Sequence, residues 1–378
     1  MHTVRAGHDV WEVRDPVGGV VPTATVVNDT VWVGGGFNST SFYGIRAATG
    51  EVTSAALLND NGAGPVSAAD DAIAYTSESC TLYSADATTG KVRWSKWLGD
   101  PLVSHPAVAS NVIYLVAPTD LTATTHTLFA FDAHTGQERW RVGVGPDAIG
   151  GPVVNGDAIY VATQDGALSR FDREGHLAWT EPVSATSAPV VAGSTIFVAV
   201  RRDKKGAAYE GILRLEQSGD GSGRPELARS WHIKLAPFSA VSRDAQDGFG
   251  EGMPRFQAAR EHLGSDQSQT LWSWQGARPV LAGDRVFAVL DGKLVALAAS
   301  DGREVWSAPR ASAPPAVRGG RVFVPTTDGS LEIHDVEKGH TLETIPLGGT
   351  AATFPPVLDR DRVIVSTNDG RVVSIAVP

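Results

Sequence analysis

A phrase of roughly forty residues recurs eight times along this chain. Each copy opens with a proline and continues through three apolar strands separated by polar turns, and the clearest copies end with Asp-Ala-x-Thr-Gly and a closing tryptophan strand. The opening prolines are Pro22, Pro65, Pro106, Pro152, Pro189, Pro279, Pro314 and Pro355. Four short strands per unit at this period predict a β-propeller.

The copy number predicts an all-β, eight-bladed ring of four-stranded antiparallel blades. The eighth copy stops after three strands, whereas residues 9–13 near the N-terminus form an apolar strand with no copy of their own. We expect this N-terminal strand to complete the last blade, because closing the ring removes an open sheet edge. A closed ring of repeats forms one domain, here residues 1–378, in spite of its length.

Composition excludes several classes of function. The net charge of -10 argues against nucleic acid as a partner. No apolar run reaches the roughly 20 residues of a membrane span, and no compact histidine spacing indicates a metal site. The N-terminus lacks a signal-peptide core. We therefore expect a cytoplasmic protein if Met1 is native, and a periplasmic or extracellular one if a leader was removed. The oligomeric state stays open.

The phrase running from Asp86 to Trp94, repeated from Asp132 to Trp140, resembles the tryptophan-docking motif of PQQ-like propellers. The resemblance covers nearly the whole chain and implies the fold. It does not select a function, because similar propellers include quinoprotein alcohol dehydrogenases, a non-enzymatic outer-membrane assembly lipoprotein and sensor domains of bacterial kinases. A composition rich in Arg, Ala, Gly and Val suggests a bacterial source.

The chain departs from the quinoprotein dehydrogenases that it resembles. Those enzymes are longer, carry an adjacent pair of cysteines above the cofactor, and bind calcium through Glu, Asn and Asp side chains. Cys80 is the only cysteine here, and no matching calcium ligands are found. The resemblance therefore implies a non-dehydrogenase member, and we expect neither PQQ nor another cofactor. The lipidated cysteine of the scaffold lipoprotein is also missing.

The turns differ systematically in length. With strands named a to d from the centre outward, the a–b and c–d turns lie on one face and stay short. The b–c turns of copies one, three and five are expanded, over residues 34–42, 117–126 and 201–210, and an insertion of about residues 234–275 interrupts the d–a connection between copies five and six. We call the face with these elaborations the decorated face and the other the plain face. Loops on a rigid scaffold usually carry function.

The insertion predicts a helix over residues 254–263, because Pro254 suits a first turn and Gly264 suits a helix end. Two interpretations stay open for this helical insertion of residues 236–275. It is either a lid over the channel mouth, or a helix that packs on the rim or makes a dimer contact. Candidate ligand contacts in this segment are Asp247, Glu251, Trp272 and Trp274.

The residues before the opening prolines should lie at the rim of the central channel, and most of them are small. His105, Arg278 and Phe354 are the large exceptions. An arginine as fixed cation and a histidine as acid or base suit an anionic ligand. Alternatively, His105 is bonded to backbone and Arg278 is an exposed rim charge. One position earlier, hydroxyl groups form a partial ring at Ser104, Ser187, Ser312 and Thr353.

Two functions follow. The first is a ligand-binding, peptide-binding or scaffold propeller whose partner, a small molecule or a peptide, occupies the decorated face. The alternative is a lyase, cyclase or hydrolase with non-quinone chemistry, in which His105 and Arg278 are catalytic at the channel mouth under the insertion. A closed pocket with a second polar group near His105 would favour catalysis, and a shallow surface with exposed aromatic rings would favour binding.

Overall fold

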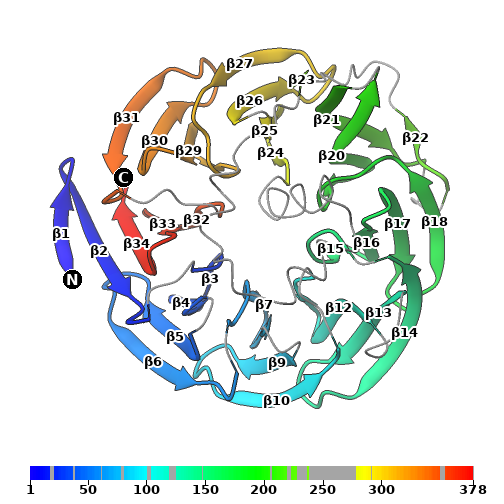
Figure 1. The fold of residues 1–378 in the computed structure, drawn as a ribbon, viewed down its shortest axis with the longest axis horizontal. Coiled ribbons are helices and arrows are strands. Elements are labelled where there is room, and N and C mark those ends of the chain that lie inside the picture. Colours follow the sequence, from blue (N-terminus) through cyan, green and yellow to red (C-terminus); the bar gives the residue numbers. More distant parts are fainter. Residues whose placement is uncertain are drawn as a thin grey trace.

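A computed structural model shows the predicted ring, with eight sheets arranged around a central axis (Figure 1). Six sheets have four strands and two have five. The described residues are 1–17, 21–36, 39–60, 62–77, 81–99, 104–118, 125–146, 148–204, 207–218, 223–227, 236–237, 278–290, 292–349 and 354–377.

Each blade has a three-residue strand innermost, and its first three strands pair antiparallel and follow one another outward in sequence order. Blades one and two contain β3 (Thr25–Val27), β4 (Thr30–Gly34), β5 (Ser41–Arg46), β6 (Val52–Leu57), β7 (Ser67–Ala69), β8 (Ala72–Thr76), β9 (Thr81–Asp86) and β10 (Val92–Trp97). Blades three and four contain β11 (Ala107–Ala109), β12 (Val112–Pro118), β13 (His126–Asp132), β14 (Glu138–Gly145), β15 (Val153–Asn155), β16 (Ala158–Ala162), β17 (Ala167–Asp172) and β18 (Leu177–Pro182).

The second half of the ring follows the same order. Blades five and six contain β19 (Val190–Ala192), β20 (Thr195–Lys204), β21 (Ala207–Glu216), β22 (Glu226–Leu227), β24 (Val280–Ala282), β25 (Arg285–Leu290), β26 (Lys293–Ala298) and β27 (Glu304–Ala308). Blades seven and eight contain β28 (Ala316–Arg318), β29 (Arg321–Pro325), β30 (Ser330–Asp335), β31 (Thr341–Pro346), β32 (Val357–Asp359), β33 (Arg362–Ser366) and β34 (Arg371–Ala376).

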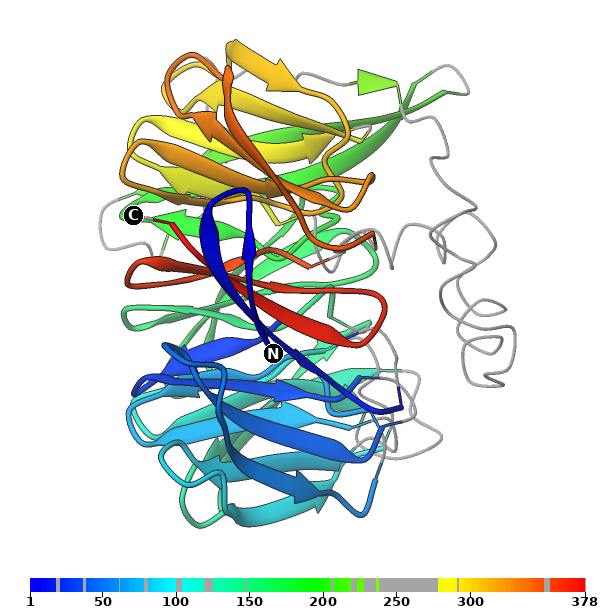
Figure 2. The ribbon, with the colours of Figure 1, turned by 90° about the vertical axis from the view of Figure 1, so that its left-hand side faces the viewer.

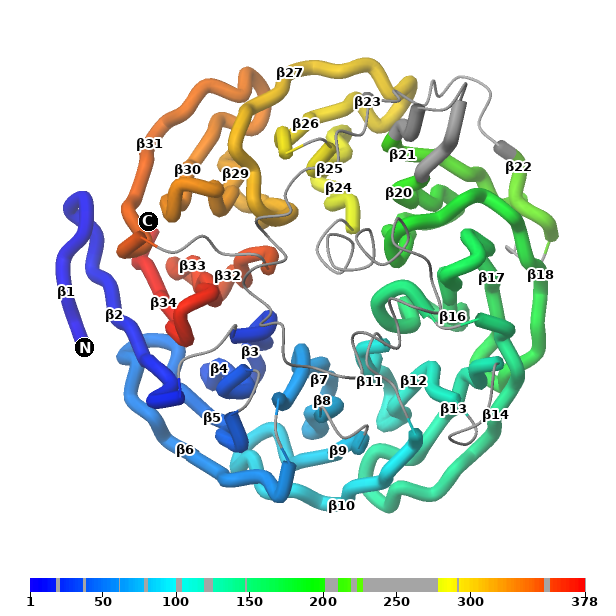
Figure 3. The backbone as a smooth tube through the Cα atoms, in the orientation of Figure 1, coloured from blue at the N-terminus to red at the C-terminus, as the bar shows by residue number. Residues whose placement is uncertain are grey.

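The prediction that the N-terminal strand closes the ring is confirmed. β2 (His8–Arg14) pairs antiparallel with β34, with Val10 opposite Ile375 and Arg14 opposite Arg371. β1 (His2–Arg5) then adds a fifth strand outside β2, so the N-terminus lies on the outer wall beside the C-terminal blade (Figure 3). The last blade is therefore built from both ends of the chain.

Four closing tryptophans join neighbouring blades. In these four the indole Nε1 donates to a backbone carbonyl in the c–d turn of the next blade, and the indole packs against the glycine of that turn. The pairs are Trp11 with Ala47 at 2.8 Å, Trp94 with Ala133 at 2.9 Å, Trp140 with Arg173 at 2.7 Å and Trp306 with Val336 at 3.0 Å. Trp231, the tryptophan that follows the third strand of blade five in the sequence, lies outside the described residues.

Burial follows strand position. The second and third strands of each blade are packed on both faces by adjacent blades, so they read as continuous apolar runs; β8 and β16, for example, are buried throughout. Outer strands alternate instead, with one face toward a neighbouring blade and one toward solvent. The hydrophobic core is therefore divided into clusters between blades rather than gathered at one centre.

The elaborations differ in form from the expected loops. In blade five the expanded b–c turn is an extension of the hairpin, since β20 and β21 pair from Thr195 opposite Glu216 to Lys204 opposite Ala207. This hairpin projects beyond the other blades on the decorated face (Figure 2). Within the predicted insertion, Ala236–Pro237 form a short strand, β23, that pairs with β21. The expected helix over residues 254–263 lies outside the described residues, and the described residues contain no helix.

Candidate functional site

His105 lies just before β11 on the rim of blade three, in close contact with blade four. Its backbone N–H donates to the carbonyl oxygen of Gly150 at 3.3 Å. A Cβ atom added at Gly151 would lie 2.3 Å from the carbonyl oxygen of His105 and 3.2 Å from its Cβ. Gly151 is therefore the neighbour that leaves room for His105, and a larger residue there would push the two rims apart.

Arg278 lies just before β24 on the rim of blade six, and its Nε donates to the carbonyl oxygen of Pro189 in blade five at 3.0 Å. Between these two sites, a Cβ added at Gly150 would lie 3.7 Å from the Cβ of Ala188. His105, Gly151, Ala188 and Arg278 thus form one continuous arc across the rims of blades three to six, which we call the mouth arc. Its two large side chains flank residues with almost no side chain.

The two ends of the mouth arc differ in charge. Burial lowers the pKa of His105 to about 4, so its imidazole is neutral near neutral pH. Burial by surrounding atoms also lowers the pKa of Arg278, although its side chain keeps solvent contact. Arginine stays protonated all the same, because its ordinary pKa is far above physiological pH. The mouth arc therefore offers one fixed cation and one neutral imidazole.

Three residues of the predicted hydroxyl ring are bonded to their own blades, and the fourth, Thr353, lies outside the described residues. The Oγ atoms of Ser104 and Ser187 are buried and accept the backbone N–H groups of Val116 and Ala199, each at 3.2 Å. The backbone N–H of Ser312 donates to the carbonyl of Pro325. These bonds connect each inner rim to the second strand of its own blade. Ligand contact by these serines stays a prediction, as it does for the half-buried Phe354.

The predicted contacts from the insertion lie outside the described residues. They are Asp247, Glu251, Trp272 and Trp274. The two interpretations of the insertion, a lid over the channel mouth or a helix that packs on the rim or makes a dimer contact, therefore both remain predictions from the sequence. Among the described residues, no carboxylate hydrogen-bonds to the imidazole of His105.

Sequence reasoning missed a buried carboxylate on the decorated face, between blades eight and one. Asp15 is 3% exposed and accepts hydrogen bonds from Ser39 Oγ at 3.0 Å, Tyr43 Oη at 2.8 Å and the backbone N–H of Val17 at 2.9 Å. It borders a small hollow of about 10 Å³ that Gly35 also lines. Its position after an outer strand was the available signal, because its two side-chain donors come from a different blade.

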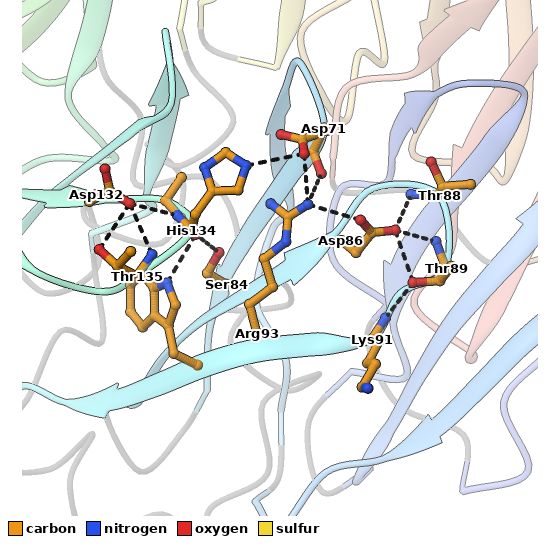
Figure 4. Close-up of polar contacts among 12 residues, drawn as sticks. Asp71, Ser84, Asp86, Thr88, Thr89, Lys91, Arg93, Asp132, His134 and Thr135 are labelled. Atoms are coloured by element: carbon orange, nitrogen blue, oxygen red, sulfur yellow. Dashed lines mark hydrogen bonds and ion pairs between the residues drawn. The ribbon is translucent and has the colours of Figure 1, made fainter.

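The plain face carries its own charged cluster (Figure 4). Asp71 lies in the a–b turn of blade two, where it is 2.9 Å from Arg93 Nη2 and 3.1 Å from Nε2 of His134 in blade three. The hydrogen bond from His134 is the largest cause of the lowered pKa of Asp71. Arg93 also binds Asp86, which caps the c–d turn. These exposed contacts connect turns of adjacent blades and need no ligand to explain them.

Within the described part of the chain, no group of three or more His, Cys, Asp or Glu side chains is arranged to hold a metal ion. The same residues include no apolar helix with the length needed to cross a bilayer.

Comparison with known proteins identifies the family. The family model described as outer membrane protein assembly factor BamB matches residues 3–125, 121–218 and 255–377, which is most of the chain. The chain belongs to the BamB family of PQQ-like repeat propellers. No curated protein matches the chain in sequence.

Solved structures agree with this assignment at the level of the fold. BamB from Moraxella catarrhalis is 15% identical, covers 97% of this chain and 96% of its own, and superposes with a TM-score of 0.67. The quinohemoprotein alcohol dehydrogenase ADHIIG from Pseudomonas putida HK5 is 12% identical, with a TM-score of 0.62 over 97% of this chain and 76% of its own. At such identities only the fold is shared.

A third structural neighbour shows how little function the BamB-type fold implies. The computationally designed protein Ika8 is 12% identical, covers 95% of this chain and 96% of its own, and has a TM-score of 0.64. The same ring therefore occurs in a designed protein and in an enzyme. For this member of the BamB family, function must be argued from the decorated face.

Proposed function

We propose that this chain is a non-enzymatic binding propeller whose decorated face holds an anionic segment of a partner protein at the channel mouth. The observation that carries the proposal is the mouth arc. The guanidinium of Arg278 is tied to Pro189 through Nε, which orients its charge at the rim. A carboxylate is the natural partner for such a planar cation.

The rest of the mouth arc supports the same ligand. A neutral His105 can donate or accept a hydrogen bond without adding charge. Gly151 and Ala188 leave the rim low between the two large side chains, so an extended segment could cross it with its backbone close to the blades. The family description, an outer membrane protein assembly factor, also favours a protein partner over a small substrate.

The enzymatic alternative has less support. General acid–base catalysis needs a second group within hydrogen-bond reach of the catalytic histidine. Within the described residues the imidazole of His105 has no carboxylate partner, and its low pKa makes it a weak base. We also propose that PQQ is not bound, because the single Cys80 cannot form the cysteine pair of the dehydrogenases that the chain resembles.

The test uses a hexaglutamate peptide as an anionic probe, with hexaglutamine as the neutral control, and calorimetry on the whole chain. Arg278→Gln removes the charge but keeps an amide that can reach Pro189, and we expect it to weaken hexaglutamate binding by about tenfold. Arg360→Gln removes an exposed arginine of the plain face, which pairs with Asp29, and should leave affinity unchanged. Equal affinity in both variants, or equal binding of the two peptides, would overturn the proposal.

A further inference from the structure

The outer strand of blade one differs from the other outer edges of the ring. β6 has the sequence Val-Thr-Ser-Ala-Ala-Leu, and among the described outer strands it alone has no charged side chain. An outer strand presents unpaired backbone N–H and C=O groups along its free edge. Proteins usually protect such edges with charges, prolines or an added strand, because an unprotected edge pairs with other chains.

The other blades use these protections at equivalent positions. In blade one, Leu57 lies opposite Ser41 at the decorated-face end of β6. In blades four and seven the residue in the same register is a proline, Pro182 opposite Ala167 and Pro346 opposite Ser330. Proline cannot donate a ladder hydrogen bond, so it ends pairing at an edge. Blade one has leucine there instead.

The apolar side chains of this edge are exposed. Leu57 is 80% exposed and Val52, at the other end of β6, is 43% exposed. Trp97 ends the outer strand of blade two in the register of Leu57 and is 55% exposed. Two adjacent outer strands therefore end in large apolar residues on the decorated-face side. Aromatic and aliphatic anchors of this kind are typical of interaction surfaces.

Blade eight shows that the rim accepts a fifth strand. There β1 pairs along β2 over four residue pairs, from His2 opposite Trp11 to Arg5 opposite His8. The backbone of Met1 adds two further bonds to Glu12, each of 2.9 Å. The outer edge of blade eight is thus covered by the chain itself, whereas β6 next to it pairs with no fifth strand from the described part of the chain.

We propose that β6 is a strand-addition site, at which an extended, uncharged segment of a partner protein pairs as the fifth strand of blade one. Backbone hydrogen bonds would give affinity, and aliphatic side chains at alternate positions would contact Leu57 and Val52. A slender segment fits better than a second ring, because β1 flanks this edge, where His2 Nε2 lies 2.6 Å from the carbonyl oxygen of Thr49. This surface is separate from the mouth arc.

The probe for the test is a synthetic peptide with three Thr-Val repeats and one lysine at each end for solubility. Calorimetry measures its affinity, and amide hydrogen exchange locates it on the whole chain. We expect protection of residues 52–57. Replacing a central valine of the peptide with proline should abolish binding, since a ladder hydrogen bond is lost.

A matched pair of variants completes the test. Ala55→Lys places a charge at an exposed position of β6, and should lower affinity by about tenfold or more. Thr344→Lys is the control, because Thr344 is exposed. We call the outer-strand position that holds the closing tryptophan in other blades the docking position; Thr344 lies one residue past it in β31, as Ala55 does in β6. Both variants should keep the Tm of the unmodified chain.

Four results would overturn the proposal. They are equal affinity in the two lysine variants, peptide protection of a strand other than β6, no binding at millimolar peptide, and self-association of the chain that Ala55→Lys abolishes. The last result would assign the edge to a second copy of this chain instead of a partner segment.

Discussion

The indole Nε1 of Trp32 donates a hydrogen bond to the carbonyl oxygen of Ala87 across 3.0 Å. In blades two, three and six this bond to the next blade comes from the outer strand, but Trp32 lies on β4, the second strand of blade one. The outer strand has Ser54 at the docking position. Gly44 makes the exchange possible, since a Cβ there would lie 2.6 Å from the Trp32 ring.

Trp32→Phe should therefore destabilise the ring as much as loss of an outer-strand tryptophan would. The phenylalanine keeps the aromatic packing but leaves the buried carbonyl of Ala87 without its donor, which costs about 1–3 kcal/mol. Thermal unfolding of the purified variant measures the loss. Trp97→Phe, at an exposed position, is the control and should change Tm little. Similar Tm values for the two variants would show that the Trp32 bond does not stabilise the ring.

The N-terminal strands should differ sharply in importance. Deletion of residues 1–5 removes only the added strand β1, so the ring should stay closed. Deletion of residues 1–14 also removes the fully buried Trp11. It removes Asp9 as well, whose carboxylate lies 3.1 Å from the buried guanidinium of Arg362, so that this cation loses its partner. We expect the longer deletion to open the ring and expose apolar strands, which size-exclusion chromatography would detect as aggregation. Monomeric, equally stable products of both deletions would contradict the closure argument.

The repeated turn aspartates should make the protein sensitive to acid. The guanidinium of Arg139, with the Thr135 amide, lowers the pKa of Asp132 in the folded state. A carboxyl whose folded pKa lies below its unfolded value stabilises the fold above the unfolded pKa, and this stabilisation is lost as the pH falls toward the folded one. Asp132→Asn should thus lower Tm near neutral pH. Below about pH 4, the Tm of this variant should decrease less steeply with falling pH than the Tm of the unmodified chain. Asp157→Asn, at an exposed a–b turn, should do neither; matching curves would refute the assignment.

His105 should contribute a second pH dependence at a higher pH. Its pKa of about 4 in the fold lies below the ordinary value of about 6.5, because burial disfavours the charged ring. The unfolded chain therefore binds the proton first, so stability falls as the pH decreases from about 6.5 toward 4. His105→Gln should reduce this fall in a Tm series between about pH 7 and 5, while the exposed His340→Gln should not. An unchanged series for His105→Gln would mean that this imidazole is solvated.

The sequence by itself determined the number of blades, the closure by residues 9–13 and the face on which the long turns collect. These features are local: the apolar strands, the opening proline and the short polar turns recur from copy to copy and need no knowledge of the neighbouring copies. It also indicated His105 and Arg278 as unusual rim residues, from their position before the opening prolines.

Only the tertiary structure decided which residues of different blades meet. Trp32 replaces an outer-strand tryptophan, Asp15 is buried under donors from blade one, and Gly151 makes room for His105. The unprotected edge of β6 likewise became visible only when its register could be compared with Pro182 and Pro346. Such contacts join residues far apart in sequence, and the repeat pattern constrains each blade without constraining the pairs of side chains that form between blades.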